Sequence, residues 1–135
     1  MKELSVEAVV QNVPIATEFV EEIVDEHDGN MKAKMQICVA VDEIFANIAM
    51  YAYPDGNGEV TIKVDVTEKP KAVKITFIDK GIPYNPLEKS DPDVTLSAEE
   101  REIGGLGIYM VKKSMDEMSY ENKDGMNILS MVKKI

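Results

Sequence analysis

The chain has 135 residues and a formal net charge of −10, with 44% hydrophobic and 30% charged residues, so we expect a single domain over residues 1–135. An acidic chain repels the phosphates of nucleic acids and anionic lipids, which argues against direct binding to nucleic acid or membrane. No apolar run is long enough to span a bilayer and the N-terminus lacks the basic-then-apolar order of a secretory signal, so we expect a cytoplasmic protein.

The first half of the chain predicts a strand and two helices. Four apolar residues alternate with polar neighbours at the start, as in a strand with one buried face: Leu4, Val6, Ala8 and Val10. A helix is expected from about Pro14 to a breaker cluster at His27, which we interpret as a solvated residue and not as a ligand. A longer amphipathic helix follows from about residue 32 to residue 50.

The second half predicts a hairpin, a long connection, a third helix and two further strands. The hairpin strands are expected at 59–67 and 72–78, the helix from Gly104 to about Met118, and the last strands at 119–122 and 127–133. Residues 80–102 show no convincing period, which is typical of a functional loop or lid. This order of elements predicts an α+β fold, a two-layer α/β sandwich with a mixed, mostly antiparallel sheet and helices on one face.

The second helix carries the first candidate site, in the sequence Asp-Glu-Ile-Phe-Ala-Asn at residues 42–47. Glu43 and Asn47 are four residues apart and therefore lie on one helix face. A carboxylate there can act as a general base, and an amide oxygen one turn away suits magnesium. A solvated pair on an exposed face is the alternative interpretation.

The second candidate site follows the expected strand at 72–78. Asp79 at a strand end can accept a hydrogen bond from an exocyclic amine such as that of adenine. Gly81, two residues later, allows the backbone to approach a ligand closely. A plain turn is the alternative, since Asp and Gly are common turn residues.

The third candidate site is the glycine-rich start of the last helix, at Gly104, Gly105, Leu106 and Gly107. Glycines at a helix start expose amide hydrogens to an anion, and the helix dipole favours negative charge there, so a polyphosphate fits. A glycine-rich cap without a ligand is the alternative. The spacing is neither that of the P-loop nor that of the dinucleotide fingerprint.

In their order and separations, the three segments resemble the N, G1 and G2 boxes of the GHKL superfamily, the ATP-binding fold shared by gyrase, the ninety-kilodalton chaperones, histidine kinases and MutL. Within it, the chain is most similar to the small anti-sigma-factor serine kinases, through residues 39–47, the Tyr51-Ala52-Tyr53 motif, residues 79–83 and residues 105–107. The resemblance extends over nearly the whole chain.

The resemblance implies roles for individual residues. Asn47 would ligate magnesium and Glu43 would be the catalytic base. Asp79 would hold the adenine amine of ATP or ADP, and Gly81 would let the base approach. The glycines at 104, 105 and 107, with Leu106 between them, would wrap the phosphates, and residues 86–102 would form the ATP lid.

The chain departs from the family pattern before the glycines. Relatives carry a basic residue there that assists the γ-phosphate, whereas this chain has Ile103, with Arg101 two residues earlier as the candidate phosphate contact. Tyr51 stands where many relatives have histidine.

Two functions remain open at this stage. The resemblance implies an ATP-dependent anti-sigma regulator that binds a sigma factor, phosphorylates a serine on an antagonist protein and assembles as a homodimer. The Ile103 departure favours the alternative, a nucleotide-dependent module that switches partners without useful catalysis. A domain that has kept the fold and lost its ligand is a third interpretation, against which Glu43, Asn47 and Asp79 argue.

Overall fold

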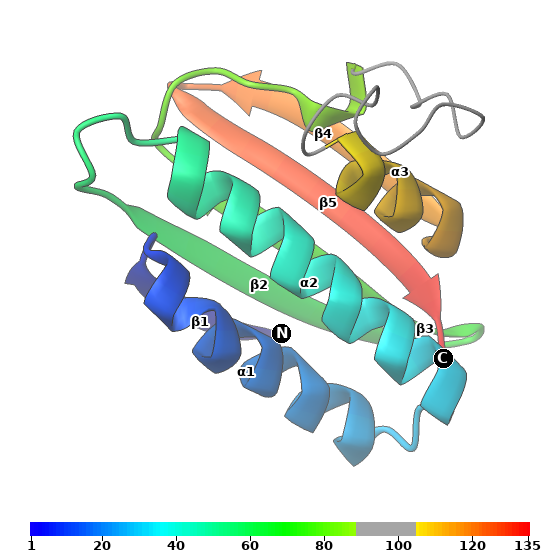
Figure 1. Ribbon diagram of the computed structural model, residues 1–135. Helices are drawn as coiled ribbons and strands as arrows, with labels where there is room; N and C mark the ends of the chain where they lie inside the picture. The colour runs from blue at the N-terminus through cyan, green and yellow to red at the C-terminus, as the bar shows by residue number, and fades with distance from the viewer. Residues whose placement is uncertain (89–104) are drawn as a thin grey trace.

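The computed structural model describes residues 1–88 and 105–135, and in these ranges the chain forms two layers, a sheet and a set of helices (Figure 1). The elements follow in the order β1 (Lys2–Glu7), η1 (Val10–Asn12), α1 (Val13–Glu26), α2 (Met31–Tyr51), β2 (Glu59–Glu68), β3 (Lys71–Asp79), η2 (Pro86–Glu88), α3 (Gly105–Ser114), β4 (Glu117–Lys123) and β5 (Met126–Lys134). No helix within the described ranges is long and apolar enough to cross a membrane.

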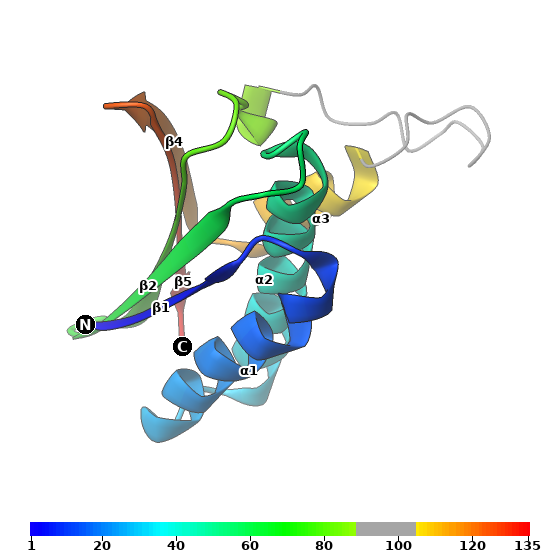
Figure 2. The same cartoon turned by 90° about the vertical axis from the view of Figure 1, so that its left-hand side faces the viewer.

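The five strands form one sheet in the order β1-β2-β3-β5-β4, and each neighbouring pair is antiparallel. The helices cover one face of this sheet, and within the described ranges the other face carries no second layer (Figure 2). The expected α+β sandwich with helices on one face is confirmed, and the described strand pairs are antiparallel throughout.

The core lies between the two layers, because the strands alternate in side-chain direction and the helices present an apolar stripe. On β2, Val60, Ile62 and Val64 are buried, and in the register of the sheet they stand opposite Asp79, Phe77 and Ile75 on β3. From α2, the buried stripe consists of Ala33, Ile37, Ala40, Val41, Ile44 and Phe45. The long helix is therefore anchored along most of its length over the central strands.

Two expected boundaries are wrong. The first strand ends at Glu7, and Val10 lies exposed in the short helix η1. The last helix ends at Ser114 and not near Met118, because Met118 pairs with Met131 across the β4–β5 ladder. The apolar residues that approach Met118 fit a helical period and a strand period equally well. Only the pairing of β4 with β5 shows that Met118 belongs to a strand.

A row of three side-chain pairs joins α1 to α2, which we call the polar seam. Thr17 bonds Asp42, the thiol of Cys38 donates to Glu21 at 3.3 Å, and Lys34 lies 3.1 Å from Asp25. Burial and the hydrogen bond to Glu21 raise the pKa of the Cys38 thiol to about 11. The seam fixes α1 beside the helix that carries Glu43 and Asn47.

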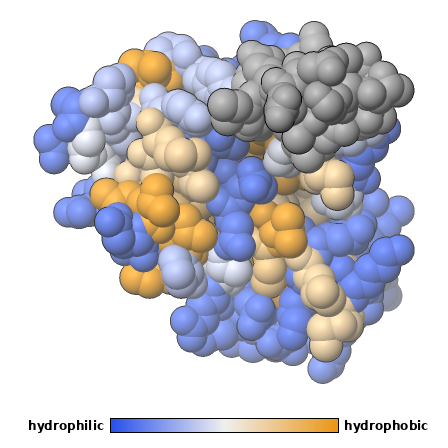
Figure 3. All heavy atoms as spheres, viewed as in Figure 1, coloured by the Kyte–Doolittle hydropathy of each residue, from blue (hydrophilic) through white to orange (hydrophobic). Residues whose placement is uncertain are grey.

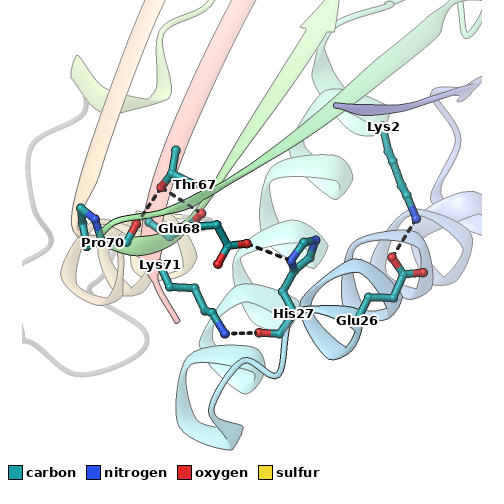
Figure 4. A network of polar contacts seen from close by, with 8 residues as sticks. Lys2, Glu26, His27, Thr67, Glu68, Pro70 and Lys71 are labelled. Carbon is teal, nitrogen blue, oxygen red and sulfur yellow. Dashed lines mark hydrogen bonds and ion pairs between the residues drawn. The ribbon is translucent and has the colours of Figure 1, made fainter.

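A second set of polar contacts closes the end of the molecule where β2 turns into β3 (Figure 4). Lys71 donates to the backbone oxygen of His27 at 2.8 Å, so a cation satisfies a carbonyl just past the end of α1. The His27 ring lies 3.6 Å from Glu68. Lys71 and Asp79 stand at opposite ends of β3, which places His27 away from the candidate site and agrees with its interpretation as a helix-end residue.

Candidate nucleotide-binding site

A pocket lies between the C-terminal half of α2 and the strand ends at Asp79 and Asn127, with an empty space of about 430 Å³ that is partly open to solvent. Its lining is mostly apolar and aromatic, with a few polar side chains, which is the usual composition of a small-molecule site. The lining residues are Ile44, Asn47, Ile48, Tyr51, Ala52, Asp79, Ile82, Tyr84, Pro86, Tyr120, Asn127 and Leu129. Asn47 and Asp79, which come from separate sequence motifs, therefore share one pocket.

Asp79 is only 5% exposed, and its carboxylate is held in place by two hydrogen bonds from the protein. Its Oδ1 accepts a hydrogen bond from the Gly81 amide at 2.9 Å and another from Nδ2 of Asn127 at 2.9 Å. A buried carboxylate needs such donors, because an unpaired buried charge is costly. Both hydrogen bonds end on Oδ1, and within residues 1–88 and 105–135 the second carboxylate oxygen accepts none, so it is available to a ligand of the pocket that Asp79 lines.

Gly81 is required by a close backbone approach. A β-carbon at residue 81 would lie 2.2 Å from the backbone oxygen of Ala52, far inside van der Waals contact. The same oxygen accepts a hydrogen bond from the Ile82 amide at 2.8 Å. The loop after β3 is therefore fastened to the end of α2, and the absence of a side chain at residue 81 makes this possible.

Asn47 lines the pocket with an unsatisfied amide. Its Nδ2 is buried and has no hydrogen-bond partner in the described part of the chain. An orphaned buried polar atom costs about 1–3 kcal/mol, so its presence in a pocket fits a site that a polar ligand completes. A half-turn of the amide places Oδ1 at the same position, where it could ligate a cation.

Glu43 lies beside the glycine-rich start of α3. A β-carbon at residue 107 would stand 2.1 Å from Oε2 of Glu43 and 2.6 Å from Cδ, so Gly107 leaves space for this carboxylate. Glu43 is half-buried and, one turn before Asn47, faces the same side of α2. The first and third sequence motifs therefore meet in space.

The aromatic motif divides into two roles. Tyr51 is half exposed at the pocket. The Tyr53 hydroxyl donates to the backbone oxygen of Glu59 at 2.6 Å and accepts from the Lys80 amide at 2.8 Å. Burial raises the pKa of the Tyr53 phenol. Tyr53 thus ties the chain after α2 to the starts of β2 and of the loop that follows β3.

Sequence reasoning missed Asn127, Tyr120 and Asn122. Nδ2 of Asn127 also donates to the backbone oxygen of Ile82 at 2.9 Å. Its Oδ1 accepts from the Tyr120 hydroxyl and from Nδ2 of Asn122, the latter at 3.1 Å. The available signal was a polar residue, Asn127, at an inward-facing position of the predicted last strand, since such a residue requires a partner. The structure supplies this partner as Asp79, which stands opposite Asn127 on β3.

Part of the expected phosphate-binding segment lies outside the described residues. This applies to Gly104, Arg101 and Ile103, and to the lid beyond η2. Gly105 and Leu106 belong to the first turn of α3, as expected from a glycine-rich helix start. Within 1–88 and 105–135, no three His, Cys, Asp or Glu side chains are grouped so as to hold a metal ion.

The chain matches a family model and several curated proteins. The model for the histidine kinase-like ATPase domain covers residues 6–133. The chain is 25% identical over 107 residues to the serine/threonine-protein kinase BtrW of Bordetella bronchiseptica, which covers 79% of this chain and 73% of that protein. It is 30% identical over 95 residues to the serine-protein kinase RsbW of Bacillus mycoides, over 67% of this chain and 58% of RsbW.

Solved structures share the fold at low sequence identity. A chain from the SiaB–SiaC complex of Pseudomonas aeruginosa aligns over 100% of this chain and 90% of its own length, with a TM-score of 0.60 and 14% identity. The histidine kinase domain of the blue-light activated histidine kinase of Erythrobacter litoralis EL346 aligns over 90% of this chain and 60% of its own, with a TM-score of 0.57 and 16% identity.

The match to the family model extends over nearly the whole chain, and the two-layer arrangement of the solved relatives is the one described above. The sequence similarity to BtrW and RsbW adds a distant relationship to the serine kinases of the anti-sigma type. The chain therefore belongs to the histidine kinase-like ATPase domain family.

Proposed function

We propose that the chain is an ATP-binding anti-sigma regulatory factor that phosphorylates a serine on an antagonist protein and sequesters a sigma factor. The observation that carries this proposal is that the first two sequence motifs share one pocket and that the third motif lies against the first. Asn47 and Asp79 line this pocket, and Gly107 of the glycine-rich motif lies against Glu43. BtrW and RsbW are named as serine or serine/threonine kinases, which supports the reaction class.

The residues present fit a magnesium-bound adenine nucleotide. Asp79 would accept the exocyclic amine through the oxygen that the protein leaves free, and the aromatic lining would bury the purine. Asn47 would ligate magnesium through Oδ1, in agreement with its unsatisfied buried amide. When bound, ATP supplies the phosphoryl group that a kinase transfers.

Glu43 would act on the protein substrate. Its carboxylate lies beside the first turn of α3, where helix-start amides attract phosphate, so a serine hydroxyl directed there would come within reach of Glu43. Glu43 would orient this hydroxyl and accept its proton. The absence of a side chain at Gly107 keeps the carboxylate free to do so.

Calorimetric titration with ATP and ADP, each with and without magnesium, tests the binding step. We expect Asn47→Ala to lose the magnesium-dependent part of the affinity, and Asp79→Asn to weaken both nucleotides by about tenfold or more, because a buried acceptor for the amine is replaced. Equal binding by the folded variants and the original chain would refute the assigned site.

Phosphotransfer to a serine-bearing antagonist from the same genome tests the catalytic step. Glu43→Gln keeps the size of the side chain and removes its basicity, so we expect transfer to fall by about a hundredfold or more with ATP affinity kept. Unchanged transfer would exclude Glu43 as the base.

The alternative is an ATP-dependent switch that binds partners without significant kinase activity. The observation in its favour is Ile103, which stands where the serine kinases of this kind carry a basic residue. In this alternative, nucleotide binding changes the affinity for a protein partner while no phosphate is transferred. Stoichiometric phosphorylation of an antagonist serine would rule it out.

A further inference from the structure

The outer surface of α1 and α2 carries features that the nucleotide site does not use. Three large apolar side chains stand in one row on α2, one helical turn apart, and each is more than half exposed: Met31 at 64%, Met35 at 63% and Val39 at 55%. Figure 3 shows apolar side chains along α2 between hydrophilic neighbours. A contiguous row of exposed apolar side chains is more often a contact surface than a face that stays in solvent.

The neighbouring helix supplies a charged flank. α1 contains five acidic residues, Glu18, Glu21, Glu22, Asp25 and Glu26, and no basic residue. Of these, Glu21 and Asp25 take part in the polar seam, whereas Glu18 and Glu22 are exposed one turn apart on the outer side of α1. The surface therefore presents an apolar row, the polar seam and an acidic row, side by side and parallel.

The opposite flank is different in charge. On that side Lys32 lies on α2, and α3 presents the exposed Met110 near Lys113. The half-buried Glu43 stands between α2 and α3, whereas Lys34 belongs to the polar seam, where it is paired with Asp25. Negative charge is thus concentrated on the α1 side of the apolar row. A partner that places apolar groups on the row needs cationic groups on one side only.

We propose that this surface is a docking site for an amphipathic helix of a protein partner, with an apolar stripe flanked on one side by Lys and Arg. The apolar stripe of such a helix repeats about once per turn, and Met31, Met35 and Val39 follow one another at four-residue steps, also about one turn apart. Methionine adapts its shape to different apolar partners. A second copy of this chain is a poor occupant, because two faces rich in carboxylates repel each other.

The inference deepens the proposed function, because it assigns the protein partner a surface and a chemistry. The docking surface lies on the outer side of the helices, whereas Asn47 and Asp79 line the pocket. Nucleotide binding and helix docking can therefore be measured separately on the same chain.

The test uses a synthetic helical peptide of about 18 residues, with leucines at i, i+4 and i+7 and arginines along one flank. A matched peptide carries glutamates in place of the arginines. Binding is followed by fluorescence anisotropy, and its location by amide shifts in NMR spectra. We expect the arginine peptide alone to bind, with shifts confined to α1 and α2, and the affinity to fall as salt is raised.

Two variants with matched controls locate the contact. We expect Met35→Asp to weaken the arginine peptide about tenfold, and Glu18→Lys with Glu22→Lys to weaken it to a similar degree at low salt. The control is Glu117→Lys with Glu121→Lys, which makes the same charge change at exposed positions of β4 and should leave the affinity within about twofold.

Several results would overturn the inference. Equal weakening by the β4 control would reduce the binding to general charge attraction, and shifts spread over the whole molecule would do the same. Dissociation of a dimer by Met35→Asp in light scattering would assign the surface to a second copy. A chain that binds ATP but no peptide overturns the docking site alone, whereas one that binds the peptide but no nucleotide overturns the proposed function alone.

Discussion

Gly107 lies so close to Glu43 that a β-carbon at residue 107 would stand 2.1 Å from Oε2 of the carboxylate. The two residues come from motifs in different helices, α3 and α2, and the contact brings the start of one helix to the middle of the other. A glycine at this position therefore has a steric role in addition to any role in binding phosphate.

Substitution of Gly107 by alanine should separate stability from catalysis. The carboxylate is the far end of a flexible side chain and alanine favours a helix, so we expect the free energy of unfolding to change by no more than about 1 kcal/mol. Displacement of Glu43 should lower phosphotransfer to the level of Glu43→Gln. Met110→Ala, an exposed change in the same helix, is the control. Full transfer by Gly107→Ala would show that the Glu43 position is not critical.

Gly81→Ala, in contrast to Gly107→Ala, should lower the stability of the fold strongly. The new β-carbon would meet the Ala52 backbone oxygen at 2.2 Å, and a backbone atom cannot rotate away. We expect a loss of about 2 kcal/mol or more in urea unfolding, with weakened ATP binding because the loop after Asp79 moves.

Gly56→Ala is the matched control for Gly81→Ala. Gly56 has a φ of +79° and nothing within 4 Å of an added β-carbon. The Gly56→Ala chain should therefore lose only about 1–2 kcal/mol of stability, the cost of a left-handed backbone for alanine, and should bind ATP as the original chain does. Weaker ATP binding by this control would show that the loss in Gly81→Ala is not specific to the loop.

The sequence predicted the bounds of α2 well and the end of α3 poorly, and the difference has a physical reason. The stripe containing Ile37, Val41 and Ile44 has one helical period over many turns, so α2 was located closely. The end of α3 was wrong because Met118 belongs to a strand that only its pairing with Met131 reveals. Local patterns record which side of an element is apolar, but not which distant strand lies beside it.

The same distinction applies to the candidate site. Asn47 and Asp79 could be predicted as site residues because their motifs are local, and both line one pocket in the structure. Asn127 was missed because its importance lies in a bond to Asp79, which is distant in the sequence. A polar residue in a predicted buried strand position is the only local sign of such a bond.

Asn127→Asp should make stability depend on pH in an unusual direction. The substitution replaces the donor to Asp79 Oδ1 by a second carboxylate, and neighbouring carboxylates raise the pKa of one of them. A carboxyl pKa above its unfolded value lowers stability as pH rises towards the folded pKa, because the folded state then holds more protons than the unfolded state. The variant should therefore be closest to the original chain near pH 4 and weakest near pH 8.

Urea unfolding of both chains at several pH values measures this difference. Gln11→Glu introduces the same charge at an exposed residue outside this network and should show little of the effect. A difference between the Asn127→Asp chain and the original that stays constant with pH would contradict the coupling to Asp79.

Cys38 should be unreactive and should destabilise the fold only in alkali. Its pKa is raised from 9.0 to about 11, so the folded state retains the thiol proton that the unfolded chain loses. Stability should consequently fall as pH rises from about 9 to about 11. The difference in urea unfolding between the original chain and Cys38→Ser isolates this effect from Tyr53, whose pKa is also raised.

Alkylation by iodoacetamide gives a second readout for Cys38. The thiolate is the reactive form, so the folded chain should react much more slowly at pH 8 than the chain in urea. Equal rates in the two states would show that the thiol is neither buried nor bonded to Glu21.

The polar seam also determines how α1 and α2 can be aligned. In the observed alignment each pair joins unlike groups, namely Thr17 with Asp42, Cys38 with Glu21, and Lys34 with Asp25. A slip of one helical turn in one direction would bring Glu21 to Asp42 and leave Lys34 without its carboxylate. A slip in the other direction would pair Glu21 with Lys34 but would leave Asp25 and Asp42 without their partners, so only the observed alignment pairs all six groups. The alignment of the helix pair is thus selected by charge as well as by packing, and a partner that pulls on α1 would have to break all three pairs before α2 could slide.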